Sequence, residues 1–217
     1  MNKFLKLLTW ELLIQNKANN FIKYLSALFL FCTISIALVN THENIDKFGI
    51  VFIIIYIPIA LISFSTHLMK SDLEDGTIEL LLSSHTSLEI VLAKFTGLYL
   101  NSWIASLLNL PIIFIAFKPS YALFAQLAIV IPLELLLICA LVVLTGTVQS
   151  YFRSNTNFLP QLLMTLLLPA IIFSGLAIEN PTKSYLIFIL TGINLVLVPT
   201  MLALASYLTR NIFGTSS

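Results

Sequence analysis

Charged side chains are scarce in this 217-residue sequence, where only 10% of the residues are Asp, Glu, Lys or Arg. An average soluble domain contains roughly 25%. Hydrophobic residues make up 59% of the chain, which is more apolar surface than a soluble core encloses, so the chain is predicted to lie in a lipid bilayer. The 11 basic and 10 acidic residues leave a net charge of +1, which argues against nucleic acid as the main partner.

Cysteine is equally scarce, and its positions argue against two kinds of site. Cys32 and Cys139 each lie within an apolar run, and neither belongs to a CxxC or Cys/His spacing. A disulfide framework and a zinc site are therefore not expected. Both cysteines are predicted to be buried as small hydrophobic residues.

Motifs for phosphate binding and hydrolysis are missing as well. None of the seven glycines forms a GxxxxGK(S/T) sequence, so the chain is not expected to bind and hydrolyse ATP as a P-loop protein does. GxSxG, HExxH and repeated aspartates of the hydrolase type do not occur either. We therefore expect a protein that is not an enzyme, has no metal site, and receives any energy of ATP hydrolysis from another polypeptide.

Long apolar runs are what the sequence does have, and crossing hydrocarbon takes about 20 mostly apolar residues. The predicted fold is all-α, a polytopic membrane protein with six transmembrane helices. The transmembrane domain is expected at 21–208, followed by a short cytoplasmic tail at 209–217. The six spans are predicted at 21–39, 48–68, 95–117, 122–148, 158–178 and 185–208.

Basic residues lie mostly on one side of these spans. If the N-terminus is cytoplasmic, that side carries eight of the 11 lysines and arginines, and the opposite side carries three. This distribution satisfies the positive-inside rule, so both termini are expected in the cytoplasm. The eight are Lys3, Lys6, Lys17, Lys23, Lys70, Lys94, Arg153 and Arg210, and the three are Lys47, Lys118 and Lys183.

Residues 1–20 are too charged to span a membrane, but their apolar side chains recur at helical spacing. The pattern predicts an amphipathic interfacial helix with Trp10 at the level of the headgroups. No small-residue cleavage site follows, so a signal peptide is not expected, and a frayed cytosolic tail is the alternative. The apolar stripe is Phe4, Leu5, Leu8 and Leu12, and the opposite side carries Lys3, Lys6 and Gln15.

The cytoplasmic connection 70–94 concentrates the acidic residues, with five of the ten acids against two lysines. Asp75 and Gly76 predict a turn, and Thr86 with Glu89 predicts a capping box, so two helical pieces joined near 83–85 are expected. An acidic and partly apolar loop suits docking to a cytosolic partner, and a solvated connector is the alternative. The acids are Asp72, Glu74, Asp75, Glu79 and Glu89, and the apolar residues are Ile78, Leu80, Leu81 and Leu82.

The segment SDLEDGTIELLLSS, followed by LEIVLAK, resembles a segment of the heme exporter protein B family (CcmB), the permease subunit of an ABC-type complex in cytochrome c maturation. The likeness extends over nearly the whole chain, including the positions of Pro132 and Pro169. It implies an ABC-2-like permease whose coupling helix receives motion from an ATP-binding subunit. The residues implied for that coupling role are Asp72, Glu74, Asp75, Gly76, Thr77, Glu79 and Leu80.

The same resemblance implies partners and cargo. The ATP-binding subunit would be CcmA, with CcmC, CcmD and the periplasmic heme chaperone CcmE as further partners. Heme would be exported, or the loaded chaperone released, in the bacterial inner membrane or alternatively the mitochondrial one. Six spans are few for a closed path, so a second permease copy or a partner permease is expected. The sequence departs from the family at Ser84 and Thr86, where prolines are usual, and 66–71 is less basic.

Histidines and one buried carboxylate are the remaining candidates for chemistry. Heme needs axial His, Cys or Met ligands. His42, His67 and His85 are predicted at different depths relative to the membrane, so they are interpreted as structural residues. Glu134 lies near the middle of the fourth span, where a charge costs at least about 2.5 kcal/mol. We predict a neutral carboxyl that is hydrogen-bonded to a polar neighbour such as Asn109, with a structural role or a role in a transport path.

Two other functions stay open at this point. A self-contained secondary transporter would normally show inverted repeats, and no convincing repeat is visible in the sequence. A non-transporting assembly scaffold would only hold partner proteins together. An ATPase-dead partner separates the scaffold from the ABC permease, because a scaffold should still function with it.

Overall fold

The computed structural model describes residues 3–17, 20–39, 56–61, 72, 75–151, 164–180 and 183–213. All regular structure in these ranges is helical, which confirms the predicted all-α class for this part of the chain. Residues 56–61 are helical as well. The other elements are α1 (Lys3–Lys17), α2 (Phe21–Val39), α6 (Thr77–Ser84), α7 (Ser87–Phe117), α8 (Tyr121–Tyr151), the 3-10 helix η1 (Met164–Leu167), α10 (Leu168–Glu179) and α11 (Tyr185–Phe213).

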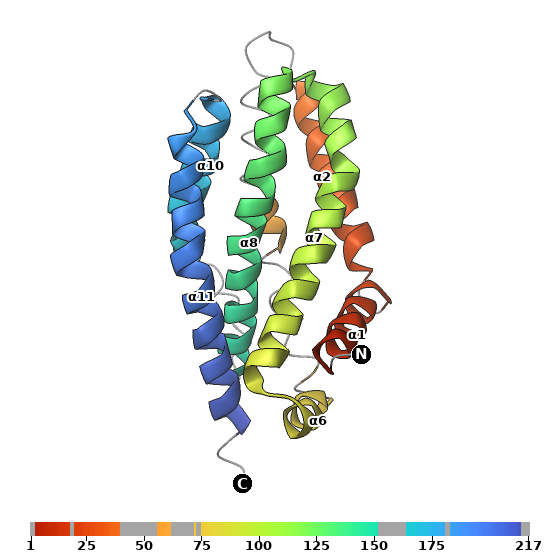
Figure 1. The fold of residues 1–217 in the computed structure, drawn as a ribbon. Coiled ribbons are helices and arrows are strands. Elements are labelled where there is room, and N and C mark those ends of the chain that lie inside the picture. Colours follow the sequence, from red (N-terminus) through yellow and green to blue (C-terminus); the bar gives the residue numbers. More distant parts are fainter. Residues whose placement is uncertain are drawn as a thin grey trace.

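Four helices, α2, α7, α8 and α11, are long and apolar enough to cross a membrane. They run side by side in an elongated bundle (Figure 1) and match the first, third, fourth and sixth predicted spans. The second predicted span lies outside the described residues except at 56–61, and the fifth is described only from 164, within the shorter apolar helix Thr165–Glu179. The chain is therefore a membrane protein with four candidate spans in its described part.

Two of the candidate spans are longer than the hydrocarbon layer of a bilayer is thick. α7 and α8 have 31 residues each, or roughly 46 Å at 1.5 Å per residue, whereas hydrocarbon is about 30 Å thick. α7 begins at Ser87, earlier than the predicted start at 95, because its capping box fixes the first turn. α11 continues to Phe213, so the predicted tail at 209–217 begins as helix.

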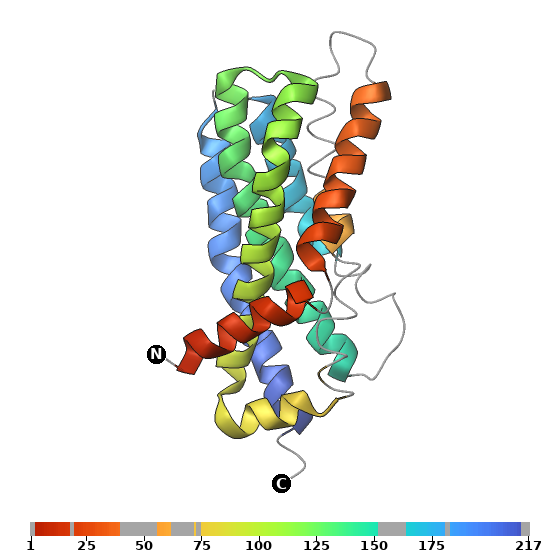
Figure 2. The same cartoon turned by 90° about the vertical axis from the view of Figure 1, so that its right-hand side faces the viewer.

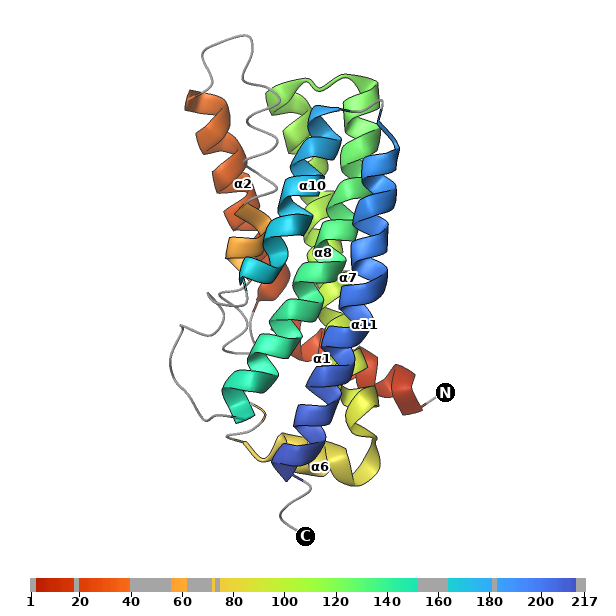
Figure 3. The ribbon, with the colours of Figure 1, turned by 90° about the vertical axis from the view of Figure 1, so that its left-hand side faces the viewer.

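α8 lies at the centre of the bundle. Its residues 137–147 are all buried, and Cys139 is fully buried as predicted. The side chain of Gln126 donates a hydrogen bond of 2.7 Å from Nε2 to the carbonyl of Ala177, which joins α8 to α10 (Figure 3). Cys32 is only half-buried, so the prediction of full burial was wrong for it, because α2 lies at the edge of the bundle against α7.

One end of the bundle holds α1, α6 and both ends of the chain (Figure 2), and we call it the base. α6 begins after Gly76, whose φ of 68° is left-handed. At the start of α7 the Thr86 hydroxyl accepts from the Glu89 N–H at 3.3 Å, and the Glu89 carboxylate accepts from the Thr86 N–H at 2.9 Å. The predicted turn, helix break and capping box are therefore confirmed.

The N-terminal helix is confirmed, but one residue that was expected on its polar outer side is buried. The inward side chains of α1 are Leu7, Glu11 and Gln15, whereas Trp10 and Leu13 are exposed. Gln15 was expected on the polar outer side. It is buried because α7 offers polar partners to this face. The frayed-tail alternative was wrong as well, since α1 packs along α7 over its length.

Candidate functional site

The outward side of α6 combines acidic and apolar side chains at the base of the bundle. Leu80 is 72% exposed, although it is a large apolar residue. It follows Glu79 on the same helix, and Asp75 lies in the turn before the helix. We call the exposed residues of this segment the α6 outer face. They are Asp75, Glu79, Leu80, Ser83 and Ser84.

The inward side of α6 is anchored on the protein itself. Ile78 is buried in the main core, while Leu81 and Leu82 pack against a small cluster that contains Leu7 of α1 and Ile90 of α7. Three of the four apolar residues that were expected to dock therefore contact the chain's own helices. One side of α6 therefore packs on the protein, and Leu80 and its acidic neighbours are exposed on the other side.

The predicted coupling residues separate into three groups. Asp75, Glu79 and Leu80 share the outward surface. Gly76 and Thr77 form the half-buried start of α6. Glu74 lies outside the described residues, and Asp72 lies against a buried lysine and not on the outer face.

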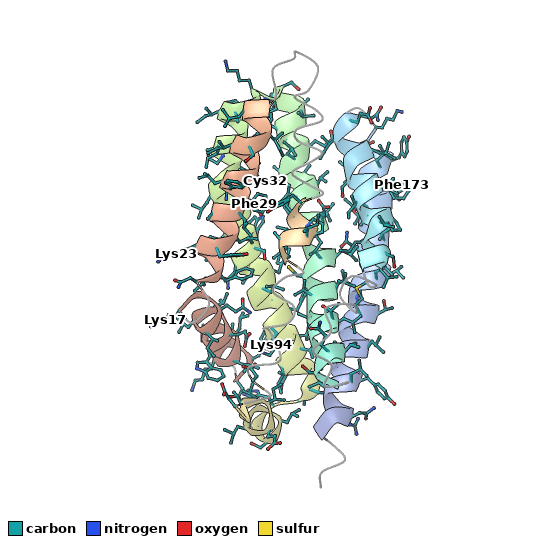
Figure 4. The ribbon with its side chains drawn as sticks, turned by 180° about the vertical axis from the view of Figure 1, so that it is seen from behind. Lys17, Lys23, Phe29, Cys32, Lys94 and Phe173 are labelled. Atoms are coloured by element: carbon teal, nitrogen blue, oxygen red, sulfur yellow. The ribbon has the colours of Figure 1, made fainter. Side chains whose placement is uncertain are left out.

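The buried lysine is Lys94, which is 2% exposed in the lower part of α7. Its Nζ donates to Asp72 Oδ2 and to both carboxylate oxygens of Glu11 in α1, the latter at 3.3 and 3.4 Å. Figure 4 places Lys94 on α7 near the base, whereas Lys17 and Lys23 lie on the outer side of the molecule, Lys23 higher up on α2. We call Glu11, Asp72 and Lys94 the charge clamp, because it joins α1, the segment before α6, and α7 at one ammonium group.

A chain of hydrogen bonds continues from the charge clamp along the contact between α1 and α7. Gln15 donates from Nε2 to Glu11 at 3.1 Å, and Asn101 donates from Nδ2 to Gln15 at 2.9 Å. Asn16 then donates to Asn101 at 2.9 Å. From Lys94 to Asn101 the contact covers about two turns of α7, and buried side chains supply both its donors and its acceptors.

Gly97 makes this close approach possible. A Cβ atom placed on Gly97 would lie 3.2 Å from Cγ of Glu11 and 3.3 Å from Nε2 of Gln15. Such distances are shorter than ordinary van der Waals contact. The absence of a side chain at this position therefore lets the polar face of α1 lie directly on α7.

Sequence reasoning missed the charge clamp. Lys94 was counted for topology and as the last residue of the LEIVLAK segment, and no role was assigned to Glu11. The available signal was spacing, because Lys94 and Asn101 are seven residues apart and Glu11 and Gln15 are four apart, so each pair lies on one helical face. Neither pair identifies the other helix as its partner.

The two predicted intramembrane polar residues do not pair with each other. Glu134 of α8 is 1% exposed, and neither of its carboxylate oxygens has a hydrogen-bond partner among the residues that the structure describes. Asn109 of α7 is also buried, but it donates from Nδ2 to the carbonyl of Ala105 at 2.8 Å. The predicted bond to Asn109 was wrong, because the amide is used within its own helix.

Histidine placement does not form a heme site in the described part of the chain. His85 lies at the joint between α6 and α7, with Nδ1 3.6 Å from a carboxylate oxygen of Glu89. His42 and His67 fall outside the described residues. Over the ranges described, no three His, Cys, Asp or Glu side chains gather to hold a metal ion. A lone imidazole beside a carboxylate does not fit a resident heme, so no step is assigned to one.

Two bacterial proteins are similar to this chain over nearly its whole length. The uncharacterized protein RC0356 of Rickettsia conorii is 44% identical over 214 residues, which cover 99% of each chain. The uncharacterized protein RP268 of Rickettsia prowazekii is 41% identical with the same coverage. The chain belongs to their family. No protein-family model matches the sequence. The similarity includes the segments that form α1, α6 and the bundle in this chain.

Proposed function

We propose that this chain is the membrane-spanning permease subunit of an ABC-type transporter, a non-catalytic partner of a separate ATP-binding subunit. The observation that carries the proposal is the α6 outer face. Leu80 is exposed together with Asp75 and Glu79 on a segment whose other side is anchored. An exposed apolar residue among carboxylates is complementary to a groove with an apolar floor and a basic rim.

The connection from α6 to α7 suits the transfer of motion. Only His85 and Thr86 separate the two helices, and the capping box holds the first turn of α7 in place. α7 then continues for 31 residues and is a candidate membrane span. A partner that displaces α6 would therefore act directly on a helix that crosses the bilayer.

The resemblance of 72–94 to the CcmB segment favours cytochrome c maturation as the process. The ATP-binding subunit on the α6 outer face is then CcmA, and CcmC, CcmD and the chaperone CcmE complete the assembly. The task is export of heme or release of the heme-loaded chaperone. A second copy of this chain, or a partner permease, completes the path through the membrane.

The proposed location is the bacterial cytoplasmic membrane, with both termini in the cytoplasm. Two arguments support it. The base holds both chain ends together with α1 and α6 (Figure 2), and the predicted topology assigns eight of the 11 basic residues to that side. The two relatives are bacterial, which favours a bacterial host over the mitochondrial inner membrane.

Charge reversal on the α6 outer face tests this function. We expect the detergent-solubilised wild type to retain a CcmA-type ATP-binding subunit in a pull-down, and the double variant Asp75→Lys, Glu79→Lys to lose at least about tenfold of that binding, because like charges then face the basic rim. The matched control is Glu179→Lys, which reverses an exposed acid at the far end of the bundle. Equal binding by the wild type and the double variant would refute the docking surface.

A self-contained secondary transporter is the second candidate, and Glu134 favours it. A buried carboxyl without a described hydrogen-bond partner is what a proton-coupled path uses. For this candidate, Glu134→Gln is expected to abolish the pH dependence of transport, because the amide does not titrate, while insertion stays normal. Transport or cytochrome c assembly that is unchanged at every pH would eliminate a coupling role for Glu134.

A further inference from the structure

The contact between α1 and α7 is built from buried polar groups. A helix that only lies on a membrane needs apolar residues toward lipid and its charges toward water. α1 instead turns Glu11 inward, where it is 5% exposed and contacts Lys94. Burying charges adds little stability, but it penalises every arrangement that leaves them unpaired. The charge clamp therefore fixes where α1 lies on α7.

The position of α1 is fixed at two levels of α7. Near the base, Lys94 contacts Glu11, and about two turns further along Asn101 donates to Gln15. Gly97 lies between these levels, where a Cβ atom would crowd both α1 side chains. A slide of α1 by one turn would break both levels at once, so α1 and the lower part of α7 behave as one body.

α6 is joined to the same body by two separate contacts. Asp72, just before α6, shares the Lys94 ammonium with Glu11. At the other end of this segment, Leu81 and Leu82 of α6 pack against a cluster that consists of Leu7 of α1 with Ile90 and Ala93 of α7. One contact is ionic and the other is apolar, and both connect the docking helix to α1 without passing through the chain between them.

α1 leads in turn to a second candidate span. It ends at Lys17, and α2 begins at Phe21. Asn20 turns the corner with a left-handed φ of 47°, and its carbonyl accepts from the N–H of Tyr24 at 3.0 Å. Because this connection is short, a movement of α1 would also move the start of α2.

From these contacts we infer that α1 is a transmission element. The charge clamp passes a displacement of α6 to α1 and on to α2, beside the direct route into α7, and Lys94 is the positioning residue that holds the two routes together. This inference rests on the proposed function, since it needs a partner that moves α6. It assigns the N-terminal helix a task beyond anchoring the chain to the membrane.

The native tryptophans provide the test. The chain has two, so Trp103→Phe leaves the exposed Trp10 on α1 as the only reporter. In lipid vesicles with a tryptophan-free variant of a CcmA-type ATP-binding subunit, we expect ATP with vanadate to change acrylamide quenching of Trp10. Glu11→Gln should lose this change while the ATP-binding subunit still binds, because the α6 outer face is intact. Lys94→Arg, which keeps the positive charge, should retain it.

Two further variants separate signalling from folding. Gly97→Ala keeps every charge but crowds the Glu11 and Gln15 side chains at the contact between α1 and α7, and it should also lose the Trp10 response. Glu179→Gln neutralises an exposed acid outside the site and should keep it. A full Trp10 response in both Glu11→Gln and Gly97→Ala, with the ATP-binding subunit still bound, would overturn the inference and leave the proposed function intact. A wild type that binds no ATP-binding subunit would overturn both.

Discussion

Lys94→Met is expected to destabilise the protein more than the same substitution at any other lysine that the structure describes. Methionine has a similar length but no charge, so Glu11 and Asp72 would keep their carboxylates in a buried site without the ammonium group that both contact. Removing one partner of a buried ion pair costs about 3–5 kcal/mol. Thermal unfolding of the detergent-solubilised protein, followed by circular dichroism, measures the loss.

The control for this result is another lysine. Lys23 is exposed on the outer side of α2 (Figure 4), and Lys23→Met should change stability by no more than about 0.5 kcal/mol. Adding Glu11→Leu to Lys94→Met should recover part of the loss, because one orphaned carboxylate is removed with its partner. Equal melting temperatures for Lys94→Met and the wild type would show that the charge clamp does not hold α1 in place.

Glu134→Leu is expected to raise the stability of the protein, whereas Lys94→Met lowers it. Neither carboxylate oxygen has a hydrogen-bond partner among the described residues, and an unsatisfied buried polar group costs about 1–3 kcal/mol. Leucine is similar in size and removes that cost. The melting temperature should therefore rise, while activity falls if the carboxyl belongs to a transport path.

Glutamine is the matched comparison for leucine at this position. Glu134→Gln keeps the shape and two polar atoms, so it should gain less stability than leucine does. A melting temperature that falls with leucine but not with glutamine would show that the side chain needs a hydrogen-bonding partner in the folded protein. In that case the carboxyl stabilises the bundle, and its place in a transport path would lose its support.

Local patterns predicted the parts of this fold that depend on near neighbours in the sequence. The capping box at Thr86 and Glu89 was predictable because both of its hydrogen bonds close within three residues. The turn at Gly76 and the four long spans in the described ranges follow from residue type and run length in the same way. The α6 outer face was partly predicted, since its acids were recognised but the anchoring of Leu81 and Leu82 was not.

Contacts between distant segments were beyond the sequence. The orientation of α1 was predicted from its apolar stripe. The side that faces the protein is instead determined by the contact of Glu11 with Lys94, which is 83 residues away in the sequence. Asn109 was proposed as a partner of Glu134 from depth alone, and depth does not say which way a side chain points around its helix. Only the packing of α7 on its neighbours determines that direction, and packing is not visible in one sequence.

The inward turn of Glu11 also changes the surface of the base. It is the only acid of α1, so once it is buried the exposed side of this helix carries positive charge alone, at Lys3, Lys6 and Lys17. Anionic lipid headgroups attract such a surface by roughly 1 kcal/mol for each basic residue. The charges of α1 thus divide into two sets, an inner one that determines the shape of the protein and an outer one that determines which leaflet it faces.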